Sequence, residues 1–186
     1  MKLGHTELPG IFVLEPEVYA DERGYFMETM RSSELADFHI PRPFVQENQS
    51  GSVRGTLRGL HFQLRTPQAK LCRVISGEVL DVAVDIRHNS PTFGRHVAVV
   101  LSAENRRQLY VPRNFAHGYA VLSEFAEFLY KCDDYYDPDD QCGVAWDDAN
   151  LGIDWRLTTN LILSEKDRLN PVLNSLGAEE LPVYSG

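Results

Sequence analysis

The sequence has no long apolar run. No segment of its 186 residues is long and hydrophobic enough to cross a bilayer, and residues 1–7 lack the apolar core of a signal peptide. We therefore expect no membrane association and a cytoplasmic location. Cysteine is scarce: Cys72, Cys132 and Cys142 are odd in number and show no paired ligand spacing. This argues against a disulfide framework or a zinc site and predicts buried, reduced thiols.

Basic residues are also few, because 18 Lys and Arg stand against 27 Asp and Glu, for a net charge of -9. This charge disfavours nonspecific nucleic-acid binding, although a local basic cluster could still hold a small anionic ligand. Hydrophobic residues form 43% of the chain, which suffices for one well-buried core. No low-complexity stretch suggests a second domain, so we expect a single domain over residues 1–186.

Short alternating segments are the main secondary-structure signal. Residues 79–87 place Leu80, Val82, Val84 and Ile86 on one face, which predicts a half-buried strand. Similar segments, separated by Gly, Pro, Asn and Ser, occur at 11–14, 57–64, 70–76, 96–101, 107–111, 118–122 and 126–132. This spacing predicts an all-β sandwich or barrel.

Helical signals are few. Residues 32–38 resemble a capped short helix, and residues 164–167 resemble the start of a second helix. The tail over residues 171–186 is expected to be irregular.

The segment around His61 resembles the metal-binding motif of cupin barrels with its metal ligands replaced. Gly55, His61 and Gly77 fit the frame of that motif, whereas Gln63 stands at the second histidine position and Lys70 at the glutamate position. An ammonium ligates a metal only after an unfavourable deprotonation, so this segment argues against a metal. A histidine beside a fixed positive charge instead suits a base that removes a proton while the lysine stabilises the developing oxyanion.

Each candidate also has a purely structural interpretation. His61 and Gln63 share one strand face, but a buried histidine can simply be a core residue satisfied by one hydrogen bond. Arg58 has the opposite parity from His61, so both face one pocket only if the chain bulges near Gly59. Otherwise Arg58 is a surface or interface residue.

Three later residues are equally ambiguous by local pattern. Tyr130 shares a face with Phe128 and Cys132 and can be a core aromatic or a proton donor. Asp167 matches a capping box that starts at Ser164, and local pattern alone favours the cap. His117 sits where a second cupin motif places its metal histidine, and without metal companions we expect it to shape the pocket.

A dense, ordered set of motifs is similar to the dTDP-4-dehydrorhamnose 3,5-epimerase family over about Gly10 to Pro171. The segments that carry the resemblance are 44–48 (FVQEN), 55–63 (GTLRGLHFQ), 70–74 (KLCRV), 90–94 (SPTFG), 101–105 (LSAEN), 115–118 (FAHG) and 130–132 (YKC). The resemblance implies a metal-free, cupin-type jelly roll that needs no cofactor. It also implies a homodimer with exchanged amino-terminal strands and a dTDP-4-keto-6-deoxyhexose substrate.

The resemblance also implies roles for individual residues. It makes His61 the general base and Asp167 the carboxylate that orients it, which overrides the capping interpretation. Lys70, with Arg58 nearby, stabilises the enolate oxygen at C4, and Tyr130 reprotonates the opposite face. The implied substrate-binding residues are completed by Arg23, Phe26, Glu28, Gln46, Asn48, Gln63, His117, Tyr136 and Lys166.

Alternative functions remain open at this point. Relatives that epimerise only C3, or that act on other dTDP-ketosugars, share the same His, Asp, Lys and Tyr set. A noncatalytic sugar-nucleotide-binding cupin has no need of His61, Lys70 and Tyr130 together, and a metal-dependent cupin is disfavoured by Gln63 and Lys70. Without the resemblance, residues 21–24 are best interpreted as an exposed turn.

Overall fold

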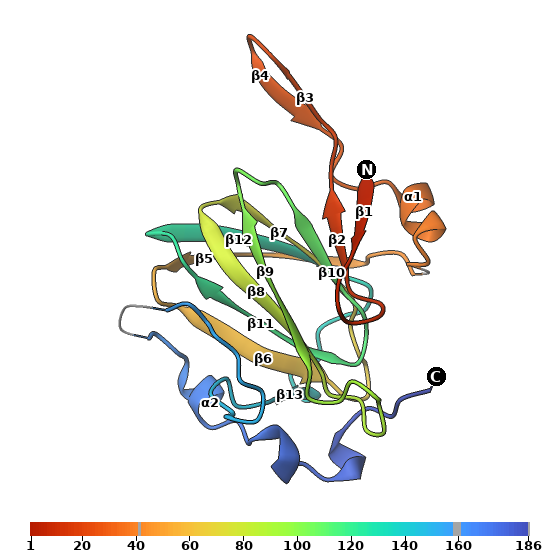
Figure 1. Cartoon of the computed structure of the whole chain (residues 1–186), viewed down its shortest axis with the longest axis vertical. Helices are drawn as coiled ribbons and strands as arrows, with labels where there is room; N and C mark the ends of the chain where they lie inside the picture. The colour runs from red at the N-terminus through yellow and green to blue at the C-terminus, as the bar shows by residue number, and fades with distance from the viewer. Residues whose placement is uncertain (41, 158–160, 186) are drawn as a thin grey trace.

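Two antiparallel sheets lie face to face in the computed structural model, which describes residues 1–40, 42–157 and 161–185 (Figure 1). One sheet has six strands in the order β1 (Lys2–His5), β2 (Phe12–Glu15), β10 (Gln108–Val111), β7 (Lys70–Ser76), β12 (Phe125–Cys132) and β5 (Gln46–Val53). The other has five, in the order β13 (Gln141–Gly143), β6 (Leu57–Gln63), β11 (Phe115–Val121), β8 (Glu78–Asp85) and β9 (His96–Ser102). The non-consecutive order is that of a jelly roll, which confirms the predicted all-β fold class.

The core between the sheets is built from alternate residues of both. Cys72, Leu109 and Phe128 project from the six-stranded sheet against Ala83 and Phe115 of the five-stranded sheet, and all five are buried. Inward residues alternate with outward ones along each strand. This period explains why apolar strands were recognisable in the sequence. By contrast, β5 has the sequence QENQSGSV, carries no apolar alternation and was missed.

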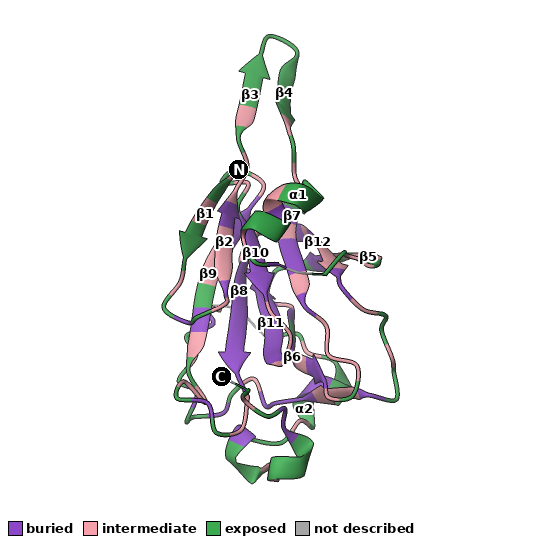
Figure 2. Ribbon diagram, turned by 90° about the vertical axis from the view of Figure 1, so that its right-hand side faces the viewer, coloured by how far each residue is buried: buried purple, intermediate pink, exposed green. Residues whose placement is uncertain are grey.

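The prediction that residues 79–87 form a half-buried strand is wrong, because β8 is buried on both faces. Val79 and Ala83 face the core between the sheets, whereas Leu80 and Val82 pack into a second apolar cluster on the far side. That cluster includes buried residues of the carboxyl-terminal segment: Leu151, Trp155, Leu173 and Leu181. Figure 2 shows β8 as a continuous buried strand. The carboxyl-terminal segment therefore forms a third layer that the strand pattern could not indicate.

The same segment corrects the expectation of an irregular tail. Two short 3-10 helices, η1 (Leu173–Ser175) and η2 (Ala178–Glu180), lie within residues 171–185. His88 and Val183 form a parallel bridge that ties the end of this segment to the chain just after β8. The tail is thus packed against the five-stranded sheet.

Two short α-helices complete the fold. The predicted helix at 32–38 is α1 (Ser32–Asp37), but its N-cap is Arg31 and no side chain caps it, so the expected cap is wrong. The second is α2 (Glu165–Arg168), capped by Ser164 as predicted. Among the described residues, no helix is long and apolar enough to span a membrane.

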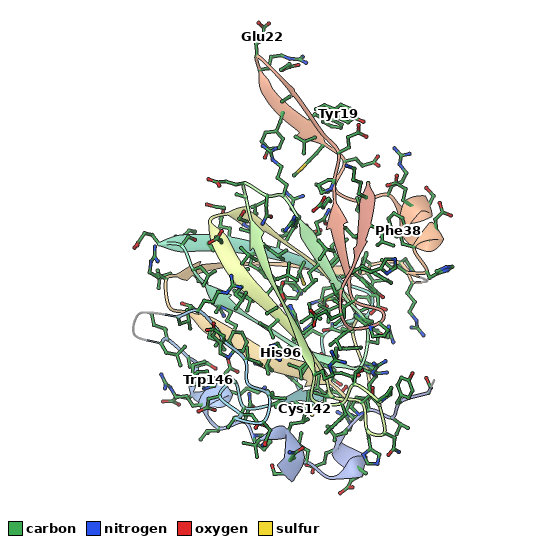
Figure 3. All side chains as sticks on the ribbon, viewed as in Figure 1. Tyr19, Glu22, Phe38, His96, Cys142 and Trp146 are labelled. Atoms are coloured by element: carbon green, nitrogen blue, oxygen red, sulfur yellow. The ribbon has the colours of Figure 1, made fainter. Side chains whose placement is uncertain are left out.

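A hairpin stands away from both sheets. It consists of β3 (Val18–Asp21) and β4 (Gly24–Met27), which pair only with each other (Figure 1). Its residues are mainly exposed (Figure 2), and Tyr19 and Glu22 project from it into open space (Figure 3). The exposed turn predicted at residues 21–24 is the tip of this hairpin. A two-stranded hairpin isolated in this way is marginally stable in water.

Candidate active site

A cavity of about 800 Å³ opens between the two sheets and contains most of the predicted site residues. The strands β5, β7 and β12 line it from one sheet, and β6 and β11 line it from the other. The predicted residues that line this cavity are Gln46, Asn48, Arg58, His61, Gln63, Lys70, His117, Tyr130, Tyr136, Lys166 and Asp167. Residues as far apart in sequence as Gln46 and Asp167 therefore meet at one site.

A bulge in β6 brings Arg58 and His61 to this cavity together, as the parity of the sequence required. The pairing register between β6 and β11 shifts between His117 and Tyr119, opposite Gly59. Gly59 has a φ of +130°, and a Cβ there would lie 2.5 Å from the Cα of Gly118. Only glycine tolerates both the conformation and the close approach. The condition under which Arg58 and His61 share one pocket, a bulge near Gly59, is therefore met.

His61 pairs with Asp167 at the cavity wall. The distance between His61 Nε2 and Asp167 Oδ1 is 2.6 Å, and the exposed side-chain fractions are 28% and 5%. The N–H of Asp167 donates to Ser164 Oγ at 3.1 Å, so the local pattern was correct about the cap. Its carboxylate is nevertheless free to bind His61, because only the backbone takes part in the cap.

Several groups set the charge of the Asp167 carboxyl. Burial alone raises its pKa, but hydrogen bonding and attraction from His61, with a bond from the Gly59 N–H, hold the pKa below its usual value. Asp167 therefore stays ionised and can stabilise a positive charge on the His61 ring. The other ring edge of His61 is left for the cavity. This arrangement suits a general base.

Tyr130 and Lys70 lie on neighbouring strands of the opposite sheet. The Lys70 Nζ is 6.0 Å from the centre of the Tyr130 ring. Burial, as the largest cause, raises the pKa of Tyr130 above its ordinary value. The phenol thus keeps its proton near neutral pH and can donate it. The cavity therefore has a histidine paired with a carboxylate on one sheet and a protonated phenol with a nearby ammonium on the other.

Gln63 has a supporting role that the sequence did not indicate. Its Nε2 donates to the Thr66 carbonyl at 2.7 Å, and its Oε1 accepts from the Asp137 N–H at 3.0 Å. Because the amide is occupied in this way, Gln63 positions the loop that carries Tyr136. The Tyr136 N–H in turn donates to Gln46 Oε1 at 3.0 Å.

A second histidine and carboxylate pair borders the cavity. His117 Nε2 lies 2.6 Å from Asp81 Oδ1, and the exposed side-chain fractions are only 7% and 0%. His117 therefore lines the cavity, as expected, but its bond to Asp81 was not foreseen. Asp81 shares a strand face with Val79 and Ala83, and a carboxylate among such apolar neighbours was the signal that a partner was needed.

Tyr119 is a cavity residue that the sequence interpretation omitted. Its hydroxyl lies 2.7 Å from Ser50 Oγ, and its ring stacks on Phe128 with centroids 4.1 Å apart. The period of two along β11 places it with His117, and this could have identified it. Cys142 also departs from expectation: it is half-buried, whereas Cys72 and Cys132 are buried, and all three are free thiols.

Three predicted residues lie outside this cavity. Arg23 and Phe26 belong to the projecting hairpin, where Phe26 is 71% exposed and Arg23 pairs with Asp21. Glu28 follows the hairpin and pairs with Arg31 at 2.9 Å. Among the described residues that line the cavity, none precedes Gln46.

Comparison with known proteins agrees with this geometry. The model of the dTDP-4-dehydrorhamnose 3,5-epimerase family matches residues 5–175. The chain belongs to this family. An enzyme of that name from Methanothermobacter thermautotrophicus is 51% identical over 181 residues, which cover 96% of this chain and 95% of the relative.

Solved structures of the family superpose closely on the chain. An epimerase from Legionella pneumophila, solved with dTDP-4-keto-L-rhamnose, has a TM-score of 0.97 and 46% identity and covers 100% of this chain and 99% of its own. A 3'-monoepimerase from Streptomyces bikiniensis, solved with dTDP-quinovose, has a TM-score of 0.88 and 33% identity, covering 96% and 92%. The epimerase family thus includes both double and single epimerases on one fold.

Proposed function

We propose that the protein epimerises dTDP-4-dehydro-6-deoxy-D-glucose at C3 and C5, giving dTDP-4-dehydro-L-rhamnose. The observation that carries this proposal is one cavity in which His61, backed by the ionised Asp167, stands on one sheet while Lys70 and Tyr130 stand on the other. Membership of the epimerase family and the 51% identity to a named 3,5-epimerase support it.

The chemistry explains why these residue types occur together. A proton on carbon becomes removable beside a ketone because negative charge moves to the ketone oxygen. His61 removes the proton, and Asp167 stabilises the imidazolium that forms. Lys70 and Arg58 supply positive charge for the C4 oxygen, and one such preorganised donor is worth about 3 kcal/mol of barrier. Both C3 and C5 are activated because both are bonded to C4, and the same base can serve both if the sugar or its ring reorients between the two events.

Inversion requires a proton from the other face of the ring. Tyr130 suits this step because its raised pKa keeps it protonated and because it lies on the sheet opposite His61. No step transfers electrons to or from a second molecule, so no redox cofactor is needed. The reaction is a proton exchange with the solvent in which the carbon skeleton is unchanged.

A C3-only epimerase is the second candidate, supported by the similarity to a monoepimerase. The test is incubation with dTDP-4-dehydro-6-deoxy-D-glucose in heavy water, with NMR detection of deuterium at C3 and C5 and a reductase to trap the product. Deuterium at both positions and trapped dTDP-L-rhamnose support the double epimerase. Deuterium at C3 alone assigns the single epimerase, and no exchange at either position contradicts both.

The Tyr130→Phe variant separates proton removal from inversion. We expect it to retain deuterium exchange, because His61 and Asp167 are unchanged, but to form trapped product at least about a hundredfold more slowly, as the loss of a general acid predicts. Equal loss of exchange and of product would assign Tyr130 to substrate binding instead.

We also propose a homodimer in which the hairpin of each copy reaches the cavity of the other. Two observations support this: the hairpin exposes Tyr19, Tyr25 and Phe26, and the described cavity lining begins only at Gln46. An arginine at the hairpin tip suits a diphosphate, because its planar fork donates paired hydrogen bonds. Arg23, Phe26 and Glu28 would then complete the nucleotide site, with Gln46, Asn48, Tyr136 and Lys166 from the receiving copy.

Mixing two inactive variants tests this exchange. In a mixed dimer of Arg23→Ala and His61→Ala chains, one site combines the intact His61 of the first chain with the intact Arg23 of the second. We expect refolded mixtures to recover roughly a quarter of wild-type activity, because half the dimers are mixed and each has one intact site. No recovery, with mixed dimers present, would place Arg23 at its own chain's site.

We also propose a cytoplasmic location for the protein, because its three cysteines are free thiols, as expected in a reducing compartment.

A further inference from the structure

Cys72, Asp81 and His117 carry potential metal-ligand atoms that lie close together beside the cavity. His117 Nε2 lies 2.6 Å from Asp81 Oδ1 and 3.8 Å from Cys72 Sγ. One ligand atom from each residue lies within 4.8 Å of the others, and all three residues are buried. Cys72 reaches this point from β7, whereas Asp81 and His117 come from β8 and β11 in the facing sheet.

We propose that Cys72, Asp81 and His117 form a binding site for a thiophilic divalent cation, with Zn²⁺ as the fitting ion, and that the bound cation inhibits the enzyme. The site shares His117 with the lining of the cavity but includes none of His61, Asp167, Lys70 and Tyr130. Cation binding itself does not depend on the proposed function, whereas its inhibitory effect does.

The donor set and its spacing fit zinc. Thiolate, imidazole and carboxylate are its usual ligands, and bond lengths of about 2.0–2.3 Å place tetrahedral ligand atoms roughly 3.5 Å apart. The observed distances of 2.6 and 3.8 Å from His117 Nε2 bracket that spacing. A cation would therefore take the place of the proton shared by His117 and Asp81, and the ligand atoms would move by less than about 1 Å.

An orphaned oxygen gives independent support. Asp81 Oδ2 is buried and has no hydrogen-bond partner among the described residues. A buried carboxylate oxygen without a partner is costly, and a cation would satisfy it. The charges also balance, because one thiolate and one carboxylate together neutralise a divalent ion. Burial raises the pKa of the Cys72 thiol well above its ordinary value, so cation binding must release the thiol proton to solvent.

The position explains the effect on activity. His117 lines the cavity and is the direct cross-strand partner of His61. A cation held by three protein ligands leaves its fourth position for a water or a substrate oxygen. Such a cation would add a positive charge beside the base that must accept a proton, and so it would inhibit. Lys70, near Cys72, opposes the cation but favours the thiolate that binds it.

A cobalt titration tests binding without any substrate. Metal-free wild-type protein receives Co²⁺ under anaerobic conditions near neutral pH. We expect saturation at one equivalent, a thiolate-to-cobalt charge-transfer band, the intense visible bands of tetrahedral Co²⁺, and loss of both on adding Zn²⁺. Cys72→Val should remove the charge-transfer band, and the matched control Cys142→Ser should keep it, because Cys142 lies on β13 away from His117.

Two results would overturn the site: no charge-transfer band in the wild type, or a band that survives Cys72→Val. Circular dichroism and thermal unfolding check that Cys72→Val is folded, and Cys72→Ala replaces it if it is not. The Zn²⁺ affinity of the variant should fall at least about tenfold, since even an outer-sphere partner of a metal contributes that much.

Inhibition is then measured by titrating Zn²⁺ into the deuterium-exchange assay. Every protein receives the same substrate concentration and the same series of Zn²⁺ concentrations, because the substrate diphosphate also binds cations. We expect wild type and Cys142→Ser to be inhibited and to recover on adding EDTA, while Cys72→Val resists at least about tenfold higher Zn²⁺. Equal inhibition of wild type and Cys72→Val would refute inhibition through this site. If the wild type shows no exchange at all, the proposed function fails, and the cobalt spectrum alone still decides whether the site exists.

Discussion

The neighbouring strands β6 and β11 each carry a histidine that is paired with a carboxylate. The two pairs have the same bond length but different surroundings. Both have an Nε2 to Oδ1 distance of 2.6 Å. Both histidines line the cavity, but the His61 side chain is 28% exposed, whereas that of His117 is 7% exposed and its partner Asp81 is fully buried. A short bond to a carboxylate therefore does not by itself identify a catalytic base.

The carboxylates explain the difference further. Asp167 lies in the first turn of α2, where its N–H donates to the N-cap Ser164 and its two carboxylate oxygens bind His61 and the Gly59 N–H. Asp81 has one oxygen on His117 and the other unpartnered among the described residues. The first pair lies at the cavity, where by our proposal it takes up and releases a proton. The second joins the neighbouring strands β8 and β11 of the five-stranded sheet and, by the proposal above, accepts a cation.

Replacing His61, the more exposed of the two histidines, should have the largest effect on activity. We expect His61→Ala to slow deuterium exchange about a thousandfold, because a general base contributes 10²–10⁴-fold. Binding of dTDP, measured by calorimetry, should remain, since His61 does not hold the nucleotide. Lost binding in a folded variant would instead make His61 a ligand-holding residue.

Breaking the buried pair should mainly affect stability. Asp81→Ala leaves His117 buried without its partner, and we expect the free energy of unfolding to fall by about 3 kcal/mol. Urea denaturation measures this, with protein concentration held equal because dimer stability depends on it. An unchanged midpoint would mean that the buried pair contributes nothing to the fold.

Neutralising Asp167, the partner of His61, should mainly affect the rate of the reaction. Asp167→Asn keeps the size of the side chain but removes the charge that stabilises the imidazolium, so we expect kcat to fall about a hundredfold with little change in KM. Steady-state kinetics with the trapping reductase measures both. A change confined to KM would contradict the assigned role of Asp167.

The smallest effect should appear in the free energy of unfolding of the protein at acidic pH, to which Asp167 contributes. The pKa of Asp167 is held below its usual value in the folded protein, so the unfolded chain binds this proton more readily. The stabilisation is therefore complete above the unfolded value of about 3.9 and is lost as the pH falls through the folded value. The stability gap between wild type and Asp167→Asn should be constant near neutral pH and should narrow below about pH 4. If the difference in the free energy of unfolding between wild type and Asp167→Asn instead grew in acid, the pKa of Asp167 would be raised by folding rather than lowered.

How far the sequence could predict the fold depended on the side-chain pattern of each strand. The apolar alternation in β7 and β12 was plain, so these strands were found, whereas the polar β5 was not. Burial of β8 on its second face could not be predicted, because Leu173 and Leu181 that cover it lie about 90 residues later. Period two reports that a face is apolar, but it does not report what covers the other face.

The candidate site divides in the same way. His61, Lys70, Tyr130 and the glycine that permits the bulge were recognisable from residue type, spacing and family motifs, because those depend on neighbours along the chain. Only the tertiary structure paired His117 with Asp81, 36 residues away, and brought Cys72 to the same nitrogen from the facing sheet. Contacts across a sandwich depend on strand order and register, which local sequence does not encode. The sequence by itself thus determined the fold class and the residue types of the proposed base and acid. The tertiary structure decided which carboxylate pairs with which histidine, because it brings α2 beside β6 and β8 beside β11.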